Sequence, residues 1–231
     1  MMDEPLSRGN SNAEGGTTPH VWTIGHATRA LSDFVALLAE HGIGQLVDVR
    51  TIPRSRHNPQ FNRDTFPRAL AEAGVGYAHM PGLGGLRRPR ADSTNTGWRN
   101  AGFRGYADYM ETAEFEQNLA ALIGLAGRRA TAIMCAEAVP WRCHRSLIAD
   151  ALTARSLPVT HVLGPGAARE HVLTPWARVK GTQITYPGAT EAHLSRQSDG
   201  SALSAPGVRA GRRRRQSSVT MAIGSPSLGA L

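Results

Sequence analysis

The sequence predicts an α/β fold: a mostly parallel five-stranded sheet with helices on both faces and a C-terminal edge hairpin. Between residues 20 and 188, short apolar runs rich in β-branched residues alternate with segments of helical periodicity, the order expected of strands joined by crossover helices. Residues 1–19 and 189–231 are small and polar, with few large apolar groups. We therefore expect a single α/β domain at 20–188, between a disordered N-terminal tail and a disordered arginine-rich tail.

Five apolar runs predict the strands, and each is β-branched enough for a sheet that is covered on both faces. The expected strands are residues 21–24, 45–49, 76–80, 130–135 and 159–163. After them, residues 171–179 and 182–186 resemble a hairpin at the sheet edge, because Gly181 suits the turn and Pro175 suits an edge strand.

Apolar residues at helical spacing predict helices at residues 33–41, 65–73, 106–110, 115–126 and 140 to about 155. Ser32 and Asp64 are the expected N-caps of the first two helices. Gly42 and Gly74 are placed to end them. Pro67 falls in a first turn, where proline is tolerated.

Composition favours an anionic partner. The formal net charge is +8, and such a charge attracts nucleotides or nucleic acid without specifying a sequence; a merely soluble arginine-rich surface is the alternative. Two cysteines do not make a disulfide framework, so a reducing cytoplasm is the expected location. We expect neither a secretory signal nor a membrane span, since no apolar run approaches about 20 residues.

Reactive side chains follow several of the predicted strands. Gly25 and His26 follow the first, Asp48 leads to Arg50 after the second, and Cys135 ends the fourth with Glu137 just beyond. Because parallel strands end at one edge of a sheet, these residues are expected to line one crevice. Two long basic segments, 51–63 and 81–104, are expected to surround it as loops and carry Arg54 and Arg56 among other arginines.

The segment 133–146 holds both cysteines of the chain. Cys143, His144, Arg145 and Arg142 are expected in the first turn of the fifth helix, where the helix dipole and the arginines would lower the pKa of the Cys143 thiol. A thiolate nucleophile is therefore physically reasonable. The alternative is a small buried cysteine that only packs.

Three chemistries fit this segment. The first is an anion cradle between Cys135 and Arg142, as in tyrosine phosphatases and rhodaneses. Two residues in the loop argue against it, because Glu137 carries the same charge as the anion and Pro140 has no backbone N–H to donate. The second is a thiol or metal site on Cys135, Cys143 and His144, with His26 as a possible fourth ligand, although no CxxC or HxxxH pattern is present. The two thiols can alternatively cycle between dithiol and disulfide.

The third chemistry assigns proton transfer or nucleophilic attack to Glu137, with arginines holding a phosphate. Glycosidic chemistry on a nucleotide would suit the basic loops. A structural ion pair of Glu137 with Arg142 or Arg145 is the alternative.

Eight short motifs occur in order at 23–26 (TIGH), 48–50 (DVR), 53–56 (PRSR), 58–62 (NPQFN), 83–85 (LGG), 105–110 (GYADYM), 135–137 (CAE) and 143–145 (CHR). Through these motifs the chain closely resembles the domain-of-unknown-function family 488 over about residues 21–188. The resemblance implies a cytoplasmic bacterial α/β domain and names no activity.

We therefore expect an enzyme that acts on a phosphorylated, nucleotide or nucleic-acid-linked substrate; a noncatalytic nucleotide- or nucleic-acid-binding module is the alternative. The expected catalytic residues are Glu137, Cys143, His144 and Cys135, without a cofactor. The expected substrate-binding residues are Gly25, His26, Asp48, Arg50, Arg54, Arg56, Arg142 and Arg145. The oligomeric state is not specified by the sequence.

Overall fold

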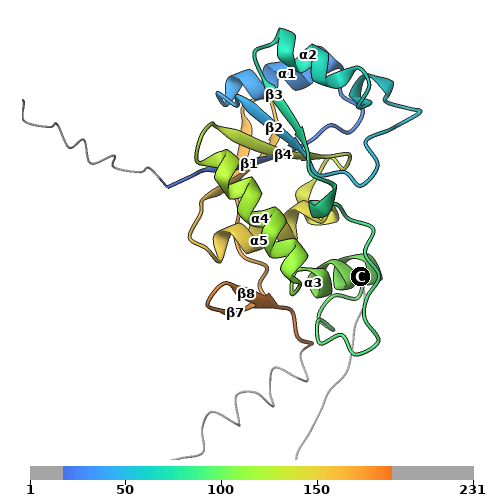
Figure 1. Cartoon of the computed structure of the whole chain (residues 1–231), viewed down its shortest axis with the longest axis vertical. Coiled ribbons are helices and arrows are strands. Elements are labelled where there is room, and N and C mark those ends of the chain that lie inside the picture. Colours follow the sequence, from blue (N-terminus) through green and yellow to red (C-terminus); the bar gives the residue numbers. More distant parts are fainter. Residues whose placement is uncertain (1–17, 189–231) are drawn as a thin grey trace, which may run out of the picture.

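The computed structural model describes residues 18–188 (Figure 1), so the two predicted tails lie outside the described residues, apart from residues 18 and 19. One sheet of six strands has the order β3-β2-β4-β1-β5-β6. Its parallel strands confirm the five predicted ones to within one residue at each end: β1 (Val21–Gly25), β2 (Gln45–Asp48), β3 (Gly76–His79), β4 (Thr131–Cys135) and β5 (Val159–Gly164).

The sixth strand corrects the predicted number of strands. β6 (Ala167–Glu170) pairs antiparallel with β5 across a tight turn in which Gly166 has a φ of +62°. All four of its residues are exposed, so the sequence has no apolar pattern there from which a strand could be predicted. β6 therefore occupies the edge of the sheet.

The predicted C-terminal hairpin is confirmed, with shorter strands than expected. It consists of β7 (Arg178–Lys180) and β8 (Gln183–Thr185), joined by a turn in which Gly181 has a φ of +61°. The two strands form a sheet of their own, so the hairpin does not extend the large sheet.

The five predicted helices are present as α1 (Leu31–Glu40), α2 (Phe66–Glu72), α3 (Ala101–Tyr109), α4 (Ala113–Ala126) and α5 (Arg145–Thr153). Gly42 and Gly74 follow α1 and α2 with positive φ, as expected, and Pro67 lies in the first turn of α2. None of the described helices has the length and apolar character needed to cross a membrane.

The two predicted N-caps are wrong. Ala30 and Thr65 occupy the N-cap positions of α1 and α2, and neither makes a side-chain capping hydrogen bond. Ser32 is already inside α1, because the carbonyl of Ala30 accepts the first helical hydrogen bond from Phe34. In α3, which starts earlier than predicted, Asn100 caps the amides of Gly102 and Phe103.

The fifth helix begins five residues later than predicted. Residues Pro140–Arg142 form a separate turn of 3₁₀-helix, and α5 starts at Arg145 with His144 as its N-cap. Cys143 has extended backbone angles between the two elements. It therefore precedes α5 instead of lying in its first turn.

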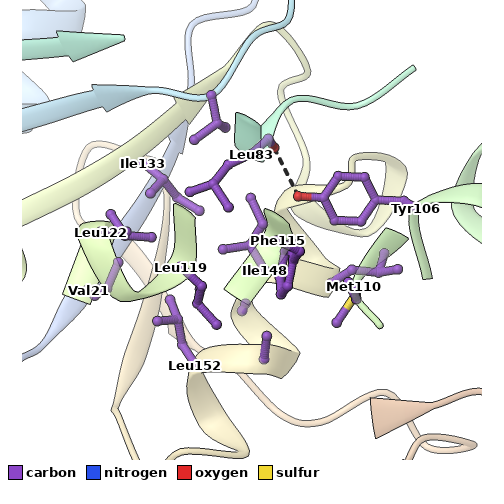
Figure 2. Packing of buried hydrophobic residues seen from close by; sticks show 14 of the residues in the cluster. Val21, Leu83, Tyr106, Met110, Phe115, Leu119, Leu122, Ile133, Ile148 and Leu152 are labelled. Atoms are coloured by element: carbon purple, nitrogen blue, oxygen red, sulfur yellow. Dashed lines mark hydrogen bonds between the residues drawn. The ribbon is translucent and has the colours of Figure 1, made fainter. Parts of the chain in front are cut away.

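Helices cover both faces of the sheet (Figure 1). α1 and α2 pack on one face, where Phe34, Leu38 and Phe66 are fully buried. α3, α4 and α5 pack on the other face, where Leu119 and Ile148 are fully buried. Figure 2 shows this second core, in which the hydroxyl of Tyr106 donates a hydrogen bond of 2.9 Å to the carbonyl of Leu83.

The connections that leave β1 and β4 run to opposite faces of the sheet. α1 follows β1 on one face, and α5 follows β4 on the other. Since β1 and β4 are hydrogen-bonded neighbours, their carboxyl ends form a topological switch point. In open α/β sheets, ligands bind in the crevice at such a point.

Candidate functional site

A cleft of about 660 Å³ opens at the carboxyl ends of β1, β2 and β4. The expected convergence of strand ends is therefore present. Seven of the predicted site residues line the cleft: His26, Arg50, Arg54, Cys135, Glu137, Cys143 and His144. We call the side formed by His26, Asp48 and Arg50 the arginine wall, and the side formed by Cys135, Cys143, His144 and Arg145 the thiol wall.

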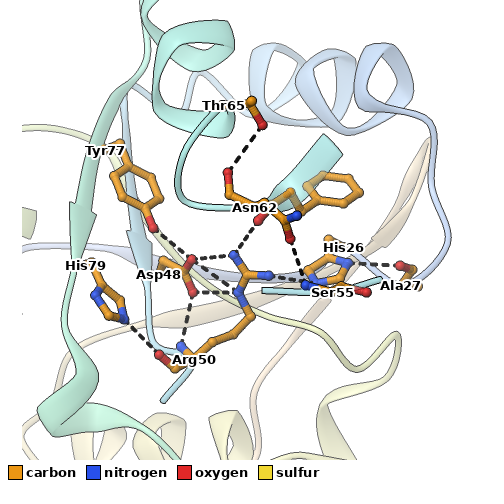
Figure 3. A network of polar contacts seen from close by, with 10 residues as sticks. His26, Ala27, Asp48, Arg50, Ser55, Asn62, Thr65, Tyr77 and His79 are labelled. Carbon is orange, nitrogen blue, oxygen red and sulfur yellow. Dashed lines mark hydrogen bonds and ion pairs between the residues drawn. The ribbon is translucent and has the colours of Figure 1, made fainter. Parts of the chain in front are cut away.

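A buried ion pair between Asp48 and Arg50 holds the arginine wall together (Figure 3). The Arg50 guanidinium donates to both carboxylate oxygens of Asp48, with the shortest contact at 2.6 Å, and to the carbonyl of Phe61 at 2.7 Å. Tyr77, which the sequence did not indicate as a site residue, donates its hydroxyl to the same carboxylate at 2.9 Å. Every charged group of this pair is therefore engaged within the protein.

His26 is fixed as a neutral imidazole between the arginine wall and its own loop. Arg50 can only donate, so its contact of 3.3 Å with Nε2 makes that nitrogen the acceptor. Nδ1 then carries the proton and donates to the carbonyl of Ala27 at 2.9 Å. Burial lowers the pKa of His26 to about 4, and the nearby positive charge of Arg50 contributes in the same direction.

The thiol wall brings the two cysteines into contact. Cys135 ends β4 and Cys143 precedes α5, and their Sγ atoms are 2.7 Å apart. Cys135 Sγ also accepts the backbone N–H of Glu137 at 3.3 Å, and its own S–H can be donated to Cys143 or, over a longer contact of 3.9 Å, to the Glu137 carbonyl. His144 Nδ1 lies 3.6 Å from Cys143 Sγ on the other side.

The two thiols have opposite pKa shifts. Burial raises the pKa of Cys135, and the adjacent Cys143 sulfur raises it further. Burial also opposes ionisation of Cys143, but the hydrogen bond from Cys135 and the neighbouring His144 and Arg145 outweigh it and hold the pKa of Cys143 well below its usual range. These directions favour ionisation at Cys143, with Cys135 as the hydrogen-bond donor.

Arg145 adds a buried positive charge that favours ionisation of Cys143, after the larger effects of Cys135 and His144. Its side chain is 0% exposed, and no ion pair to a carboxylate involves it among residues 18–188. One guanidinium nitrogen donates to the carbonyl of Glu137 at 2.6 Å, whereas its Nε has no partner. A buried guanidinium without a counter-ion is costly, so ionisation of Cys143 stabilises both groups.

Gly25, expected to bind substrate, lies beneath this arrangement and outside the set of residues that line the cleft. A side-chain carbon at this position would come within 1.8 Å of the Glu137 carbonyl oxygen and 3.0 Å of the Arg145 guanidinium. Glycine is therefore required for the Glu137 carbonyl to reach Arg145 across the end of β1.

Glu137 has an exposed carboxylate at the rim of the cleft. The ion pair with Arg142 or Arg145 that was weighed as its structural role is not formed; Arg145 instead bonds the backbone carbonyl of Glu137. The carboxylate is therefore free to meet a ligand.

Loop arginines lie near the mouth of the cleft. Arg54 is exposed and lines it, and Arg56 is exposed on the same loop. Arg142 lines an adjoining hollow of about 270 Å³, which also contacts Glu137, Cys143 and His144. Cys143 is therefore reached from two connected sides.

Two apolar lining residues were missed from the sequence. Ile52 and Leu86 line the cleft and are 66% and 81% exposed. Leu86 also has a φ of +59°, which is uncommon for a branched residue and costs about 1–3 kcal/mol. Nothing in the local sequence signals that conformation, because leucine is not a residue that favours it.

A second polar network lies away from the cleft and was also missed. His171 joins Asp150 to His161 through contacts of 2.9 Å each, and His161 contacts the buried hydroxyl of Thr23 at 2.7 Å. A smaller cavity of about 260 Å³ beside it is lined by three tryptophans, Trp98, Trp141 and Trp176.

The arrangement of the described side chains does not match a metal site. Within residues 18–188, no group of three or more His, Cys, Asp or Glu side chains has the arrangement of a metal site. His26, weighed as a fourth ligand, directs its Nε2 to Arg50 and not to the sulfurs.

Comparison with known proteins adds a family but no activity. No curated protein and no solved structure shows a significant match. The model of the family described as Domain of unknown function DUF488 matches residues 30–152. This range includes Asp48, Arg50 and the whole thiol wall, and it is shorter than the resemblance over 21–188. Because the match covers more than half of the chain, this protein belongs to the DUF488 family.

Proposed function

We propose that the protein is an enzyme that acts on a phosphorylated, nucleotide or nucleic-acid-linked substrate in the cleft between the two walls. The observation that carries this proposal is the Cys143 thiol, which contacts a second thiol at 2.7 Å and whose pKa is lowered by the hydrogen bonds from Cys135 and His144 and by the charges of His144 and Arg145. Strongly shifted titratable groups in a cleft are typical of functional sites.

Cys143 is the proposed nucleophile. The thiolate is the reactive form of cysteine, and a positively charged, partly accessible surrounding maintains it at neutral pH. Cys143 fits this description because Arg145 and His144 flank it and two hollows open onto it. Cys135 assists by donating its hydrogen bond to the thiolate.

Glu137 is the proposed proton donor or acceptor. Its carboxylate is exposed at the rim and lines both hollows together with Cys143. A general acid or base must lie within reach of the reacting group. A substrate seated over Cys143 would present its leaving group to Glu137.

The exposed arginines would contact the anionic part of the substrate. Arg54 and Arg142 line the two hollows, and Arg56 lies on the same loop as Arg54. Arginine forms bidentate, charge-assisted hydrogen bonds to phosphate. Arg50 has a different role, because its guanidinium is engaged by Asp48 and Phe61 and holds the wall in place.

The cysteine content agrees with a reducing compartment. Both cysteines are free thiols in the structure, and a thiolate nucleophile requires that they stay reduced. We therefore propose the cytoplasm as the site of action, where structural disulfides are rare.

Turnover of a substrate panel tests the proposal. The purified full-length protein is incubated with nucleotides, sugar phosphates and short nucleic acids, and products are measured by liquid chromatography and mass spectrometry. We expect turnover by the wild type, a loss of at least about a hundredfold in Cys143→Ser, and a smaller loss in Glu137→Gln.

Binding measurements give the matching control. Arg54→Ala is expected to weaken phosphate-dependent binding by a few-fold and more strongly at low salt, whereas Arg68→Ala on exposed α2 should leave it unchanged. Salt-sensitive binding without turnover in any variant would overturn the enzyme proposal and favour the noncatalytic binding module.

A further inference from the structure

The chemistry of the thiol pair extends beyond a single nucleophile. We propose that Cys135 and Cys143 form a reversible intramolecular disulfide when the cleft meets a hydroperoxide, and that this bond switches the site off. Disulfide formation needs only the two thiols, whereas the loss of activity that it would cause rests on the proposed function.

The geometry already places the sulfurs for this bond. Their Sγ atoms are 2.7 Å apart, so closing to the S–S distance of about 2.05 Å requires less than about 1 Å of movement. Cys143 lies in an extended segment between the 3₁₀ turn and α5, outside any regular element. Cys135 is the last residue of β4.

Access and reactivity favour Cys143 as the sulfur that meets the oxidant. Both side chains are buried, with 4% of Cys143 and 3% of Cys135 exposed, but Cys143 lines both hollows, whereas Cys135 lines only the larger one. A low-pKa cysteine that an oxidant can reach, next to a second cysteine, is the kind that oxidises reversibly. Cys135, as a neutral thiol in contact with Cys143, is placed to act as the resolving cysteine.

The step balances with a hydroperoxide as the oxidant. The Cys143 thiolate attacks the distal oxygen, the O–O bond breaks, and the alkoxide or hydroxide leaves and takes up a proton, so that Cys143 becomes a sulfenic acid. The Cys135 sulfur then attacks Cys143 Sγ, and the hydroxyl leaves as water with the proton of Cys135. Two thiols are oxidised to one disulfide, and the peroxide is reduced to an alcohol and water, or to water alone from hydrogen peroxide.

Arg145 makes this disulfide easy to reduce. In the reduced state the charge of this buried guanidinium is one of the influences, after Cys135 and His144, that lower the pKa of Cys143. A disulfide has no charge, so oxidation removes this favourable interaction, and no carboxylate pairs with Arg145 among the described residues. Stabilisation of the reduced form makes a dithiol pair more oxidising, and such bonds are labile rather than structural.

The test follows thiols and mass in the full-length protein. Reduced protein, freed of reductant, is treated with a slight excess of hydrogen peroxide and then denatured for thiol counting and intact-mass measurement. We expect wild type to lose both thiols and two hydrogen atoms while remaining monomeric on a non-reducing gel. Reduced glutathione at cytoplasmic ratios should restore both thiols.

Two variants assign the roles. Cys135→Ser should form a sulfenic acid at Cys143 that reacts with dimedone and then gains further oxygen atoms, because no resolving thiol is present. Cys143→Ser should keep the Cys135 thiol under the same treatment. Thermal unfolding of each variant checks that it is folded, and the wild-type result stands without them.

The inference is overturned if wild type keeps both thiols, gains oxygen without losing two hydrogens, or forms only intermolecular disulfides. A disulfide that survives excess glutathione would overturn the switch and indicate a structural bond. Failure of the proposed function looks different: the disulfide forms and reverses, but the reduced protein turns over no substrate. A disulfide that leaves turnover unchanged would overturn the regulatory part alone.

Discussion

The arginine wall and the thiol wall face the same cleft but differ in how their polar groups are satisfied. In the arginine wall, Arg50 meets both oxygens of Asp48, the carbonyl of Phe61 and Nε2 of His26. In the thiol wall, the Nε of Arg145 and the Nε2 of His144 are buried without a hydrogen-bond partner. The first wall is complete within the protein, and the second is not.

The two walls therefore differ in the roles that we expect of them. A fully satisfied buried network rigidifies its surroundings and offers little to a ligand, whereas unsatisfied buried polar groups in a native structure call for an explanation such as a catalytic role or a bound molecule. We therefore propose that the arginine wall positions the cleft and that the thiol wall carries the chemistry.

The largest predicted effect concerns the contribution of the arginine wall to the stability of the protein. Asp48→Asn should lower the free energy of unfolding by about 3–5 kcal/mol, because it leaves the Arg50 guanidinium buried beside a neutral group. Glu72→Gln, which removes the exposed ion pair with Arg68, should cost less than about 0.5 kcal/mol. Urea denaturation of both variants measures the two values. Equal costs would show that the arginine wall is not a supporting network.

A second prediction concerns the reactivity of the thiol wall. Cys135, His144, Arg145 and Tyr106 surround Cys143, and the net effect lowers the pKa of its thiol. Iodoacetamide should therefore modify Cys143 at pH 7 at least about tenfold faster than Cys135, whose pKa is raised by burial and by Cys143.

The pH profile sharpens this prediction. The rate at Cys143 should stay nearly constant as the pH falls from 9 to 7, because the thiol remains ionised above its lowered pKa. An ordinary thiol with a pKa of about 8.5 loses close to tenfold per pH unit below that value. Peptide mapping by mass spectrometry resolves the two sites. A steep decline of the modification rate at Cys143 over this pH range would contradict the lowered pKa of its thiol.

The smallest predicted effect concerns the acid stability of the arginine wall. The pKa of His26 falls from 6.5 to about 4 on folding, chiefly through burial. Below pH 6.5 the unfolded chain therefore binds a proton that the folded protein excludes, so stability declines from about pH 6.5 toward pH 4. Buried His161, whose pKa is lowered to about 3, adds to the same decline.

His26→Gln tests the contribution of His26, because glutamine keeps a hydrogen-bond acceptor for Arg50 and does not titrate. The unfolding free energy, measured in urea at pH 7, 6 and 5, should fall less steeply in the variant than in wild type. Parallel slopes would mean that His26 is protonated in the folded protein or does not differ between the two states.

The sequence predicted the parts of the fold that depend on local pattern. Buried β-branched runs marked the five parallel strands, and the ends of those strands placed His26, Arg50 and Cys135 together. β6 was missed because its four residues are exposed. The sequence predicted that the fifth helix starts at Pro140. Pro140 instead begins a 3₁₀ turn of three residues, and Cys143 after it has an extended backbone.

The chemistry of the site was less predictable because it depends on tertiary partners. The sequence placed Arg145 in the first turn of the fifth helix and among the expected substrate-binding residues, yet its side chain is fully buried and bonds the Glu137 carbonyl. Only the folded structure shows that its charge acts on Cys143. Arg50, expected to bind substrate, lines the cleft and also forms an ion pair with Asp48, which Tyr77 joins from a neighbouring strand. The sequence did not predict these partners.

The pairing of β1 with β4 continues past both strands, since the amides of His26 and Ala27 donate to the carbonyls of Cys135 and Ala136 at 3.0 Å. The floor of the cleft is thereby formed by two chain segments that stay hydrogen-bonded beyond the ends of their strands. The exposed side chains at its entrance, Ile52, Arg54 and Leu86, belong to other loops. Substitutions in these entrance loops should therefore alter which molecule the cleft admits without disturbing the backbone that holds Cys135.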